Sequence, residues 1–256
     1  MIYSFDGSYD GLLTSVFTAF ERKQFTLQLL TTDDFQETLF EKPLTIHSDR
    51  QKADRVLSGL QKKLPKNAVA DFWKAYLSED PKIYSIILKI MIHVFKGNTD
   101  ILSNYGDEDV LYFHQTLKKV SRERHRVKAF VRFQKSEDGM YTAIMEPDFN
   151  VLPLVADFFR KRYADQRWLI YDNKRKYGLY YDLQQVTEVE LTATENSALQ
   201  NLQTQIHLDS NDSRYARMWK GYFDSTNIAA RKNMKLHLQH VPRRYWKYLP
   251  EKQNTG

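Results

Sequence analysis

The amino-acid sequence predicts an α+β fold, and two observations support this prediction. Apolar residues recur at helical spacing through much of the N-terminal half, whereas short alternating segments separated by turns dominate the second half. We expect a helical N-terminal half, a mixed or antiparallel sheet with flanking helices in the second half, and basic C-terminal helices. The chain has 256 residues and a hydrophobic fraction of 42%, enough for a substantial core. We expect a single α+β domain over residues 1–250, in which residues 48–124 can form a helical subdomain, and a tail at 251–256.

The first elements follow from a turn near the N-terminus. Asp6, Gly7 and Ser8 form a turn after a short alternating strand at 1–5, and Ser8 can cap a helix that runs to about Lys23. Two further alternating segments, 25–30 and 38–46, are predicted strands.

Helical spacing then dominates up to about residue 123. Ser48 or Asp49 can cap the first of these helices, and Pro65 ends it. Pro81 suits the first turn of a helix that covers the apolar run at 83–95. This run is interrupted by polar residues and is too short to span a bilayer. The remaining predicted helices cover 68–77 and 107–123.

The pattern changes at Val127. Alternation over 127–133 predicts a half-buried strand, Glu137 to Gly139 a hairpin turn, and 140–145 the returning strand. A helix at 151–163 and strands at 168–171, 177–181 and 186–191 are predicted to follow. A polar connection at 192–212 leads to basic helices that begin at Ser213.

Composition and missing motifs exclude several classes of site. The chain has no cysteine, so it offers neither a disulfide nor a thiolate metal or iron–sulfur site. It contains no glycine-rich phosphate loop, no HExxH motif and no histidine–carboxylate pair at ligand spacing, so we predict no metal and no cofactor. His93, inside an apolar helix, is expected to be a hydrogen-bonded core residue. The N-terminus lacks the pattern of a secretory signal, which predicts a cytoplasmic protein without a membrane segment.

Three clusters of positive charge are the main functional signal. Segment 214–248 holds nine basic side chains against Asp224 alone, and seven aromatic ones are interleaved with them. Segment 118–135 holds eight basic side chains against Glu123, and segment 160–176 holds seven against two aspartates. Each cluster alone is typical of a solvated helix face. If the three converge in space, they form a surface for phosphate backbones and stacked bases.

The aromatic residues of segment 214–248 separate into two groups. Trp219, Tyr222 and Phe223 fit a buried helix face, whereas Tyr245 and Trp246 are flanked by basic residues and are better candidates for exposure. Tyr245 is the preferred stacking residue, although Trp246 also suits the packing of the last helix. The candidate nucleic-acid-binding residues are Arg122, Arg124, Arg126, Arg162, Arg175, Arg231, Lys232, Asn233, Arg243, Arg244 and Tyr245.

Asp6 and Asp10 are the candidate catalytic residues. Two carboxylates in a turn before a helix can bind a metal or polarise water. The alternative interpretation is a capped turn, in which the glycines supply unusual φ angles and an aspartate starts the helix.

Several motifs resemble one bacterial family whose members are described as probable DNA metabolism proteins. They are the opening YSFDGSYDGLL at 3–13, a middle segment from Glu146-Pro147-Asp148 through WLIYD at 168–172 to Tyr180, and a C-terminal segment from Trp219 to Glu251. The resemblance covers most of the chain and implies a role with DNA, but it carries over no catalytic residues. Members of that family are typically encoded beside a radical S-adenosylmethionine (SAM) protein thought to modify or repair DNA. In some bacteria a related domain is joined to a uracil-DNA-glycosylase-like domain.

The function predicted from the residues and the resemblance is that of a DNA-binding accessory protein in DNA repair or modification. The resemblance implies a radical SAM partner, which would supply any radical chemistry because this chain has no cysteine. One alternative is a glycosylase- or nuclease-like enzyme that acts on a DNA base or nucleotide through Asp6 and Asp10. Another is an interaction module whose basic face binds an acidic partner.

Overall fold

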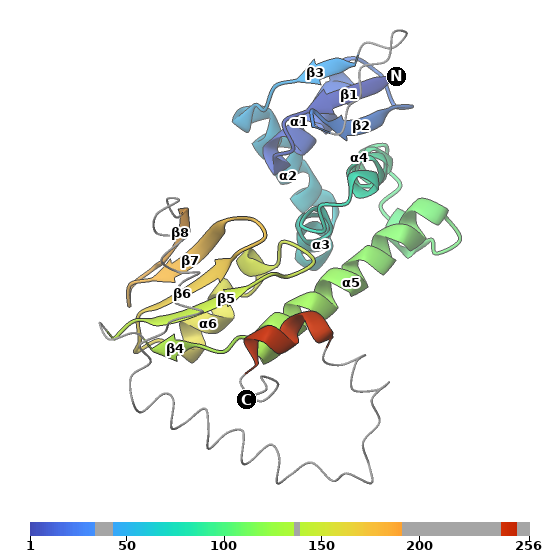
Figure 1. The fold of residues 1–256 in the computed structure, drawn as a ribbon. Coiled ribbons are helices and arrows are strands. Elements are labelled where there is room, and N and C mark those ends of the chain that lie inside the picture. Colours follow the sequence, from blue (N-terminus) through green and yellow to red (C-terminus); the bar gives the residue numbers. More distant parts are fainter. Residues whose placement is uncertain (34–42, 136–138, 191–241, 250–256) are drawn as a thin grey trace, which may run out of the picture. The chain divides into compact units, whose positions relative to one another are not determined.

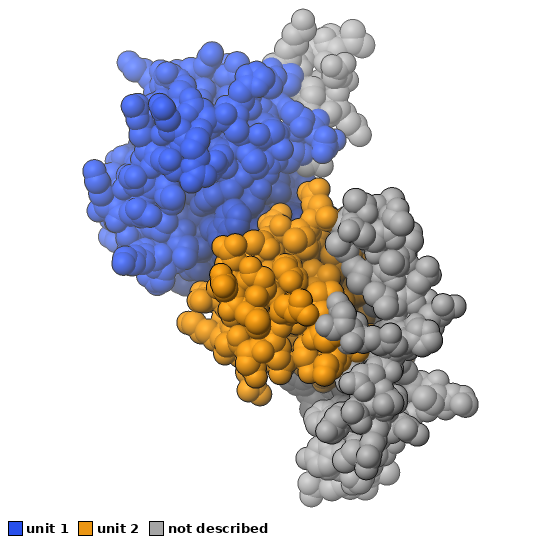
Figure 2. Space-filling model, turned by 90° about the vertical axis from the view of Figure 1, so that its left-hand side faces the viewer, with its two compact units in different colours: residues 1–122 blue, residues 123–256 orange. Residues whose placement is uncertain are grey.

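A computed structural model describes residues 1–33, 43–135, 139–190 and 242–249 (Figure 1). The chain divides into two compact units, residues 1–122 (unit 1) and 123–256 (unit 2), shown in different colours in Figure 2. The helix α5, Glu108–Phe130, crosses this division. Whether the two units together form the predicted single domain over 1–250 is not tested by this division, so the single domain stays a prediction.

Unit 1 combines a small parallel sheet with several helices. The strands β1 (Ile2–Phe5), β2 (Gln28–Thr31) and β3 (Leu44–Ile46) lie in the order β2-β1-β3, and β1 pairs in parallel with both neighbours. The helices are α1 (Tyr9–Glu21), α2 (Arg50–Lys63), α3 (Lys66–Tyr76), α4 (Pro81–Phe95) and the first part of α5, with the 3-10 helix η1 (Ile101–Ser103) before α5.

The helix starts in unit 1 follow from local capping. Ser8 accepts a hydrogen bond from the Gly11 amide at 2.9 Å, as predicted, and Asp49 rather than Ser48 caps α2. Pro81 occupies the first turn of α4, whose apolar residues are buried over nearly its whole length. His93 on this helix is exposed, so the predicted core position is wrong for it: the solvent-facing side of α4 includes His93 and Lys89.

Unit 2 contains a five-stranded mixed sheet in the order β4-β5-β6-β7-β8. Only β5 and β6 pair in parallel, and the other neighbours are antiparallel. The elements are β4 (Gln134–Lys135), β5 (Tyr141–Met145), η2 (Leu152–Leu154), α6 (Ala156–Arg162), β6 (Trp168–Asp172), β7 (Tyr177–Tyr181), β8 (Val186–Glu190) and the 3-10 helix η4 (Arg243–Tyr248). The predicted α+β class, with helices first and a mixed sheet in the second half, is confirmed.

The strand predicted over 127–133 is wrong, because α5 continues to Phe130 and the next strand, β4, begins only at Gln134. The buried face of this part of the helix includes Val120, Glu123 and Val127, and the carboxylate among them hid the helical spacing of the apolar residues. The helix predicted at 151–163 is also shorter, since a 3-10 turn precedes α6.

Two further predictions concern the basic C-terminal helices and the absence of a membrane segment. The basic helices from Ser213, with Trp219, Tyr222 and Phe223, lie outside the described residues except for η4. Among the described residues, no helix is both long enough and apolar enough to cross a membrane.

Candidate functional site

A pocket of about 850 Å³ in unit 1 collects side chains from three helices. Its lining comes from the start of α1, the β3–α2 connection, one face of α2 and one face of α3. Such a volume lies within the range of small-molecule sites. The lining residues are Ser8, Tyr9, Asp10, Ser48, Arg50, Leu57, Gln61, Lys66, Val69, Ala70 and Trp73.

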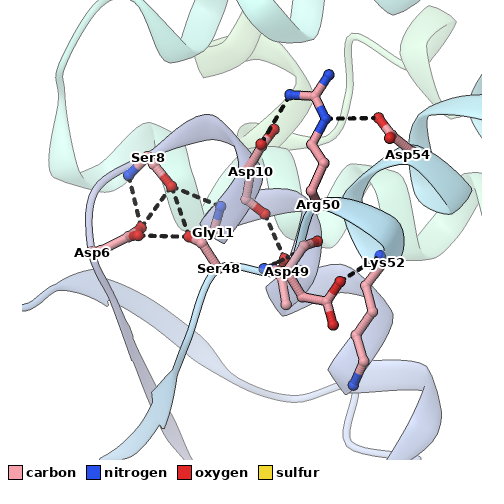
Figure 3. Close-up of polar contacts among 10 residues, drawn as sticks. Asp6, Ser8, Asp10, Gly11, Ser48, Asp49, Arg50, Lys52 and Asp54 are labelled. Carbon is pink, nitrogen blue, oxygen red and sulfur yellow. Dashed lines mark hydrogen bonds and ion pairs between the residues drawn. The ribbon is translucent and has the colours of Figure 1, made fainter.

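Asp6 lies beside this pocket in a hydrogen-bonded cluster (Figure 3). Its carboxylate accepts hydrogen bonds from the Ser8 amide at 3.0 Å, the Ser8 hydroxyl at 2.7 Å and the Ser48 hydroxyl at 2.6 Å. The two hydroxyl oxygens are 2.9 Å apart. The cluster therefore ties the turn before α1 to the connection before α2.

Gly11 makes room for this cluster. A Cβ atom at Gly11 would lie 2.4 Å from a carboxylate oxygen of Asp6 and 2.8 Å from the Ser48 hydroxyl. The prediction that the glycines of this turn supply unusual φ angles is confirmed for Gly7, at φ 78°, and wrong for Gly11, which lies within helix α1.

The environment of Asp6 favours its ionised form. Partial burial opposes ionisation, but the hydrogen bonds from Ser48 and Ser8 outweigh it and lower the pKa of Asp6 below its usual value. A carboxylate with a lowered pKa is a weaker base, and its oxygens are already occupied. The geometry of Asp6 fits a structural role better than proton transfer.

Asp10 lines the pocket and is paired with a cation. Arg50 donates to Asp10 at 3.1 Å and forms a second ion pair with Asp54 at 3.3 Å (Figure 3). The Asp10 side chain is 35% exposed and that of Arg50 74%. The structure therefore places Asp10 in the pocket lining with its charge balanced by Arg50, whereas Asp6 is not part of that lining.

Aromatic rings form one side of the pocket. Trp73 stacks on Tyr76 at 5.3 Å and 22°, and it contacts Tyr9 edge to face at 4.9 Å. The Tyr76 hydroxyl donates to the Gly7 carbonyl at 2.6 Å, which connects the ring group to the turn before α1. Burial raises the pKa of Tyr76 to about 12, so this hydroxyl stays protonated at neutral pH.

No group of three or more candidate metal ligands occurs among residues 1–33, 43–135, 139–190 and 242–249. The carboxylates of Asp6 and Asp10 are held by hydroxyl groups and by Arg50 instead.

Elements from the described parts of segments 160–176 and 214–248 contact the C-terminal part of α5 in unit 2. Lys128 on α5 lies 4.7 Å from the centre of the Phe158 ring on α6, the helix that ends in Arg160, Lys161 and Arg162. Tyr245 of η4 donates a hydrogen bond of 2.5 Å to Glu123, and its ring lies 5.2 Å from that of Phe130. The 3-10 helix η4, drawn in red, accordingly lies beside α5 in Figure 1. One part of α5 thus contacts elements from both of the other clusters.

The predicted nucleic-acid contacts differ in accessibility. Exposed residues are Arg122, Arg162 and Arg243. Arg124 is partly buried, and so is Arg126, which pairs with Glu123 at 3.3 Å. Arg231, Lys232 and Asn233, together with the side chain of Arg244, lie outside the described residues.

Two predicted contacts need correction. Arg175 is only 10% exposed, because its guanidinium group pairs with Asp172 at 2.8 Å and donates to the carbonyls of Pro147 and Asp148. Tyr245 is 1% exposed, so the predicted exposure is wrong. Its ring packs on Phe130 and its hydroxyl binds Glu123, which leaves no ring face for a base.

Sequence patterns did not identify several residues that complete the pocket of unit 1 and the basic region around α5. Trp73 and Arg50 were not singled out, since they belong to different helices and no short motif joins them. Glu123 offered a signal: it is the lone acid in a run of eight basic residues, and the structure buries it to 1% exposure. A single opposite charge in such a run is a candidate buried partner.

The fold and these two regions define an α+β protein with a ligand-sized pocket in one unit and clustered cations in the other. Family comparison identifies the chain further: it belongs to the domain-of-unknown-function family DUF4130, which matches residues 81–251. That match includes the described part of unit 2, whereas the pocket residues precede it. No curated protein and no solved structure matches the chain.

Proposed function

We propose that this protein binds DNA through the exposed and partly exposed cations around the C-terminal part of α5, as an accessory protein in bacterial DNA repair or modification. The observation that carries the proposal is the contact of α5 with both α6 and η4, which brings basic residues of three sequence segments into one neighbourhood. Cations gathered in this way raise the local positive potential, and DNA phosphates are the polyanion that such a surface attracts. The resemblance to DNA metabolism proteins favours DNA over other polyanions.

Buried side chains also affect the charge of this region. Glu123 neutralises part of the positive charge from within, because it pairs with Arg126 and accepts from Tyr245 and from the Asp148 amide at 2.8 Å. Burial, followed by the nearby positive charge of Arg124, lowers the pKa of Lys128. Repulsion of this kind between neighbouring cations is relieved when phosphate binds.

The test measures the affinity of the full chain for a labelled DNA duplex at about 50 and about 200 mM salt. We expect the logarithm of the affinity to fall linearly with the logarithm of salt concentration, with a slope of about −0.9 per neutralised phosphate. Replacing Arg124, Lys161 and Arg162 together by Gln reduces the steepness of that slope by up to about 3, since each lost contact removes about 1.

The matched control removes the same charge from unit 1. Arg55, Lys62 and Lys63 are exposed on α2, and their combined replacement by Gln leaves the slope unchanged. Absence of DNA binding at low salt by the folded chain contradicts the proposal, and so does an equal effect of the two triple variants. An RNA duplex of the same sequence serves as competitor, and stronger binding of RNA also overturns it.

The proposed partner is a radical SAM protein of DNA modification or repair, as the family resemblance implies. Co-purification with such a protein should persist after nuclease treatment. If nuclease abolishes co-purification, DNA alone bridges the two proteins, and a direct partnership is rejected.

A further inference from the structure

The pocket of unit 1 is lined in part by one face of α2 and one face of α3. Lys66, Val69, Ala70 and Trp73 follow helical spacing on α3, and Leu57 and Gln61 do so on α2. The two faces therefore supply both apolar and polar groups to the lining.

The aromatic side of the pocket is fixed in place before any ligand binds. Trp73 is stacked on Tyr76, and Tyr9 contacts both rings, at 4.9 Å and 5.1 Å. Burial raises the pKa of Tyr9, whose hydroxyl is therefore a donor at neutral pH. A rigid aromatic surface suits a planar ligand, because little side-chain entropy is lost on binding.

Three polar side chains of the lining have no hydrogen-bond or ion-pair partner among the described residues: Tyr9, through its hydroxyl, Gln61 and Lys66. The charge of Asp10, by contrast, is matched by Arg50. The pocket consequently has one unmatched positive charge, that of Lys66, which favours an anionic ligand over a cationic one. Lys66 is the first residue of α3, and Pro65 before it supplies no side-chain cap.

We propose that this pocket binds a nucleotide, with the base on the apolar surface formed by Leu57, Val69 and Trp73 and the phosphate beside Lys66. Tyr9 and Gln61 supply the hydrogen bonds that a base or sugar requires. The shared chemistry is a planar heterocycle joined to a phosphate, either as a free nucleotide or as an unpaired nucleotide of a strand.

Calorimetric titration of the full chain with each deoxynucleoside monophosphate tests the proposal, with the matching nucleoside and inorganic phosphate as partial ligands. We expect binding of a monophosphate that exceeds binding of either part. The variant Lys66→Gln loses about tenfold or more of the monophosphate affinity, as expected for a hydrogen bond to a charged group, and keeps nucleoside binding. Lys62→Gln removes an equal charge outside the pocket and changes neither.

A second variant examines the base. Trp73→Leu is expected to weaken the monophosphate and the nucleoside alike, and its thermal unfolding shows whether the fold persists. Because Lys66 is exposed, Lys66→Gln keeps the proposal testable even if Trp73→Leu unfolds.

The two sources of nucleotide are separated with a 5′-phosphorylated single-stranded oligonucleotide, measured in the background of the Arg124, Lys161 and Arg162 triple variant. A Lys66-dependent affinity for the oligonucleotide without affinity for monophosphates assigns the pocket to a strand. If neither ligand binds in a Lys66-dependent way, the proposal is overturned. This result is distinguishable from failure of the proposed function, which concerns the salt-dependent binding of duplex DNA by unit 2.

Discussion

The two units place their charged groups in opposite ways. In unit 1 a continuous apolar core fills the space between the sheet and the helices, and the charged residues of the candidate site lie partly exposed around the pocket. Among the described residues of unit 2, two carboxylates lie inside the fold, Glu123 at 1% exposure and Asp172 at 0%. The difference teaches that charge in unit 1 is available to a ligand, whereas part of the charge in unit 2 holds the fold together.

Each buried carboxylate of unit 2 compensates its desolvation with several donors. Asp172 accepts from the amides of Lys174 and Arg175, at 2.9 and 3.2 Å, and from the Arg175 guanidinium group at 2.8 Å. Burial is the largest influence on Asp172 and raises its pKa, while the Arg175 charge and these hydrogen bonds oppose that rise. An arrangement of this kind is costly to break from one side, because the remaining partner keeps a buried charge.

The largest effect is expected from Asp172→Ala. The change leaves the 10% exposed Arg175 without its carboxylate and removes the acceptor for two backbone amides, so we expect a loss of about 3–5 kcal/mol in the free energy of unfolding. Hydrogen exchange followed by mass spectrometry measures it, and the protection loss should centre on β6 and β7.

The control for Asp172→Ala is Asp182→Ala. Asp182 also accepts from two backbone amides, those of Gln184 and Gln185, both at 2.8 Å, but it is not buried and forms no ion pair with the described residues. A loss for Asp182→Ala as large as that for Asp172→Ala would contradict the importance of burial.

The next effect concerns the connection between η4 and α5. Tyr245→Phe removes the hydroxyl that donates to Glu123 and leaves this carboxylate with fewer donors, so we expect a loss of about 1–3 kcal/mol. Faster hydrogen exchange in peptides covering 242–249 measures it. Tyr180→Phe is the control, because the Tyr180 hydroxyl has no hydrogen bond to the described residues. Equal exchange in the two variants would show that the Glu123 contact does not hold η4.

A smaller effect is expected in unit 1 from Gly11→Ala. Alanine favours a helix over glycine by about 1 kcal/mol, but its Cβ would lie 2.4 Å from Asp6, and overpacking costs about 1–3 kcal/mol. We expect a net loss of about 1 kcal/mol in chemical denaturation. Gly106→Ala is the control, since a Cβ there meets its nearest neighbour at 3.4 Å. A gain in stability for Gly11→Ala would show that the Asp6 side chain moves aside for the added methyl group at little cost.

The sequence predicted the fold where local signals agree with the tertiary packing. The Ser8 cap, the helix end at Pro65, the helix start at Pro81 and the strands predicted at 168–171 and 177–181 follow from capping, backbone geometry and alternation alone. The continuation of α5 through Phe130 could not be predicted in this way, because Glu123 occupies a core position that only its tertiary partners make favourable.

The candidate site was predictable only in part for a related reason. Asp6 and Asp10 stand in one short motif, and the structure places both at or beside the pocket. Trp73 and Arg50 reach it from distant positions in the sequence, which requires the packing of α1, α2 and α3. The exposure of Tyr245 was predicted from its basic neighbours, but its distant partner Glu123 decides its environment.

The smallest effect tests whether Asp6 has the structural role that its surroundings indicate. Because the folded pKa of Asp6 is lowered, its contribution to stability is present above the unfolded pKa of about 3.9 and is lost as pH falls through the folded value. The free energy of unfolding of the native chain minus that of Asp6→Asn should therefore be constant above about pH 5 and should shrink at lower pH. Urea denaturation at several pH values measures this difference, and Asp54→Asn, outside the hydrogen-bonded cluster, serves as the control. A difference that stays constant down to about pH 2 would mean that the hydrogen bonds of Asp6 do not stabilise its ionised form.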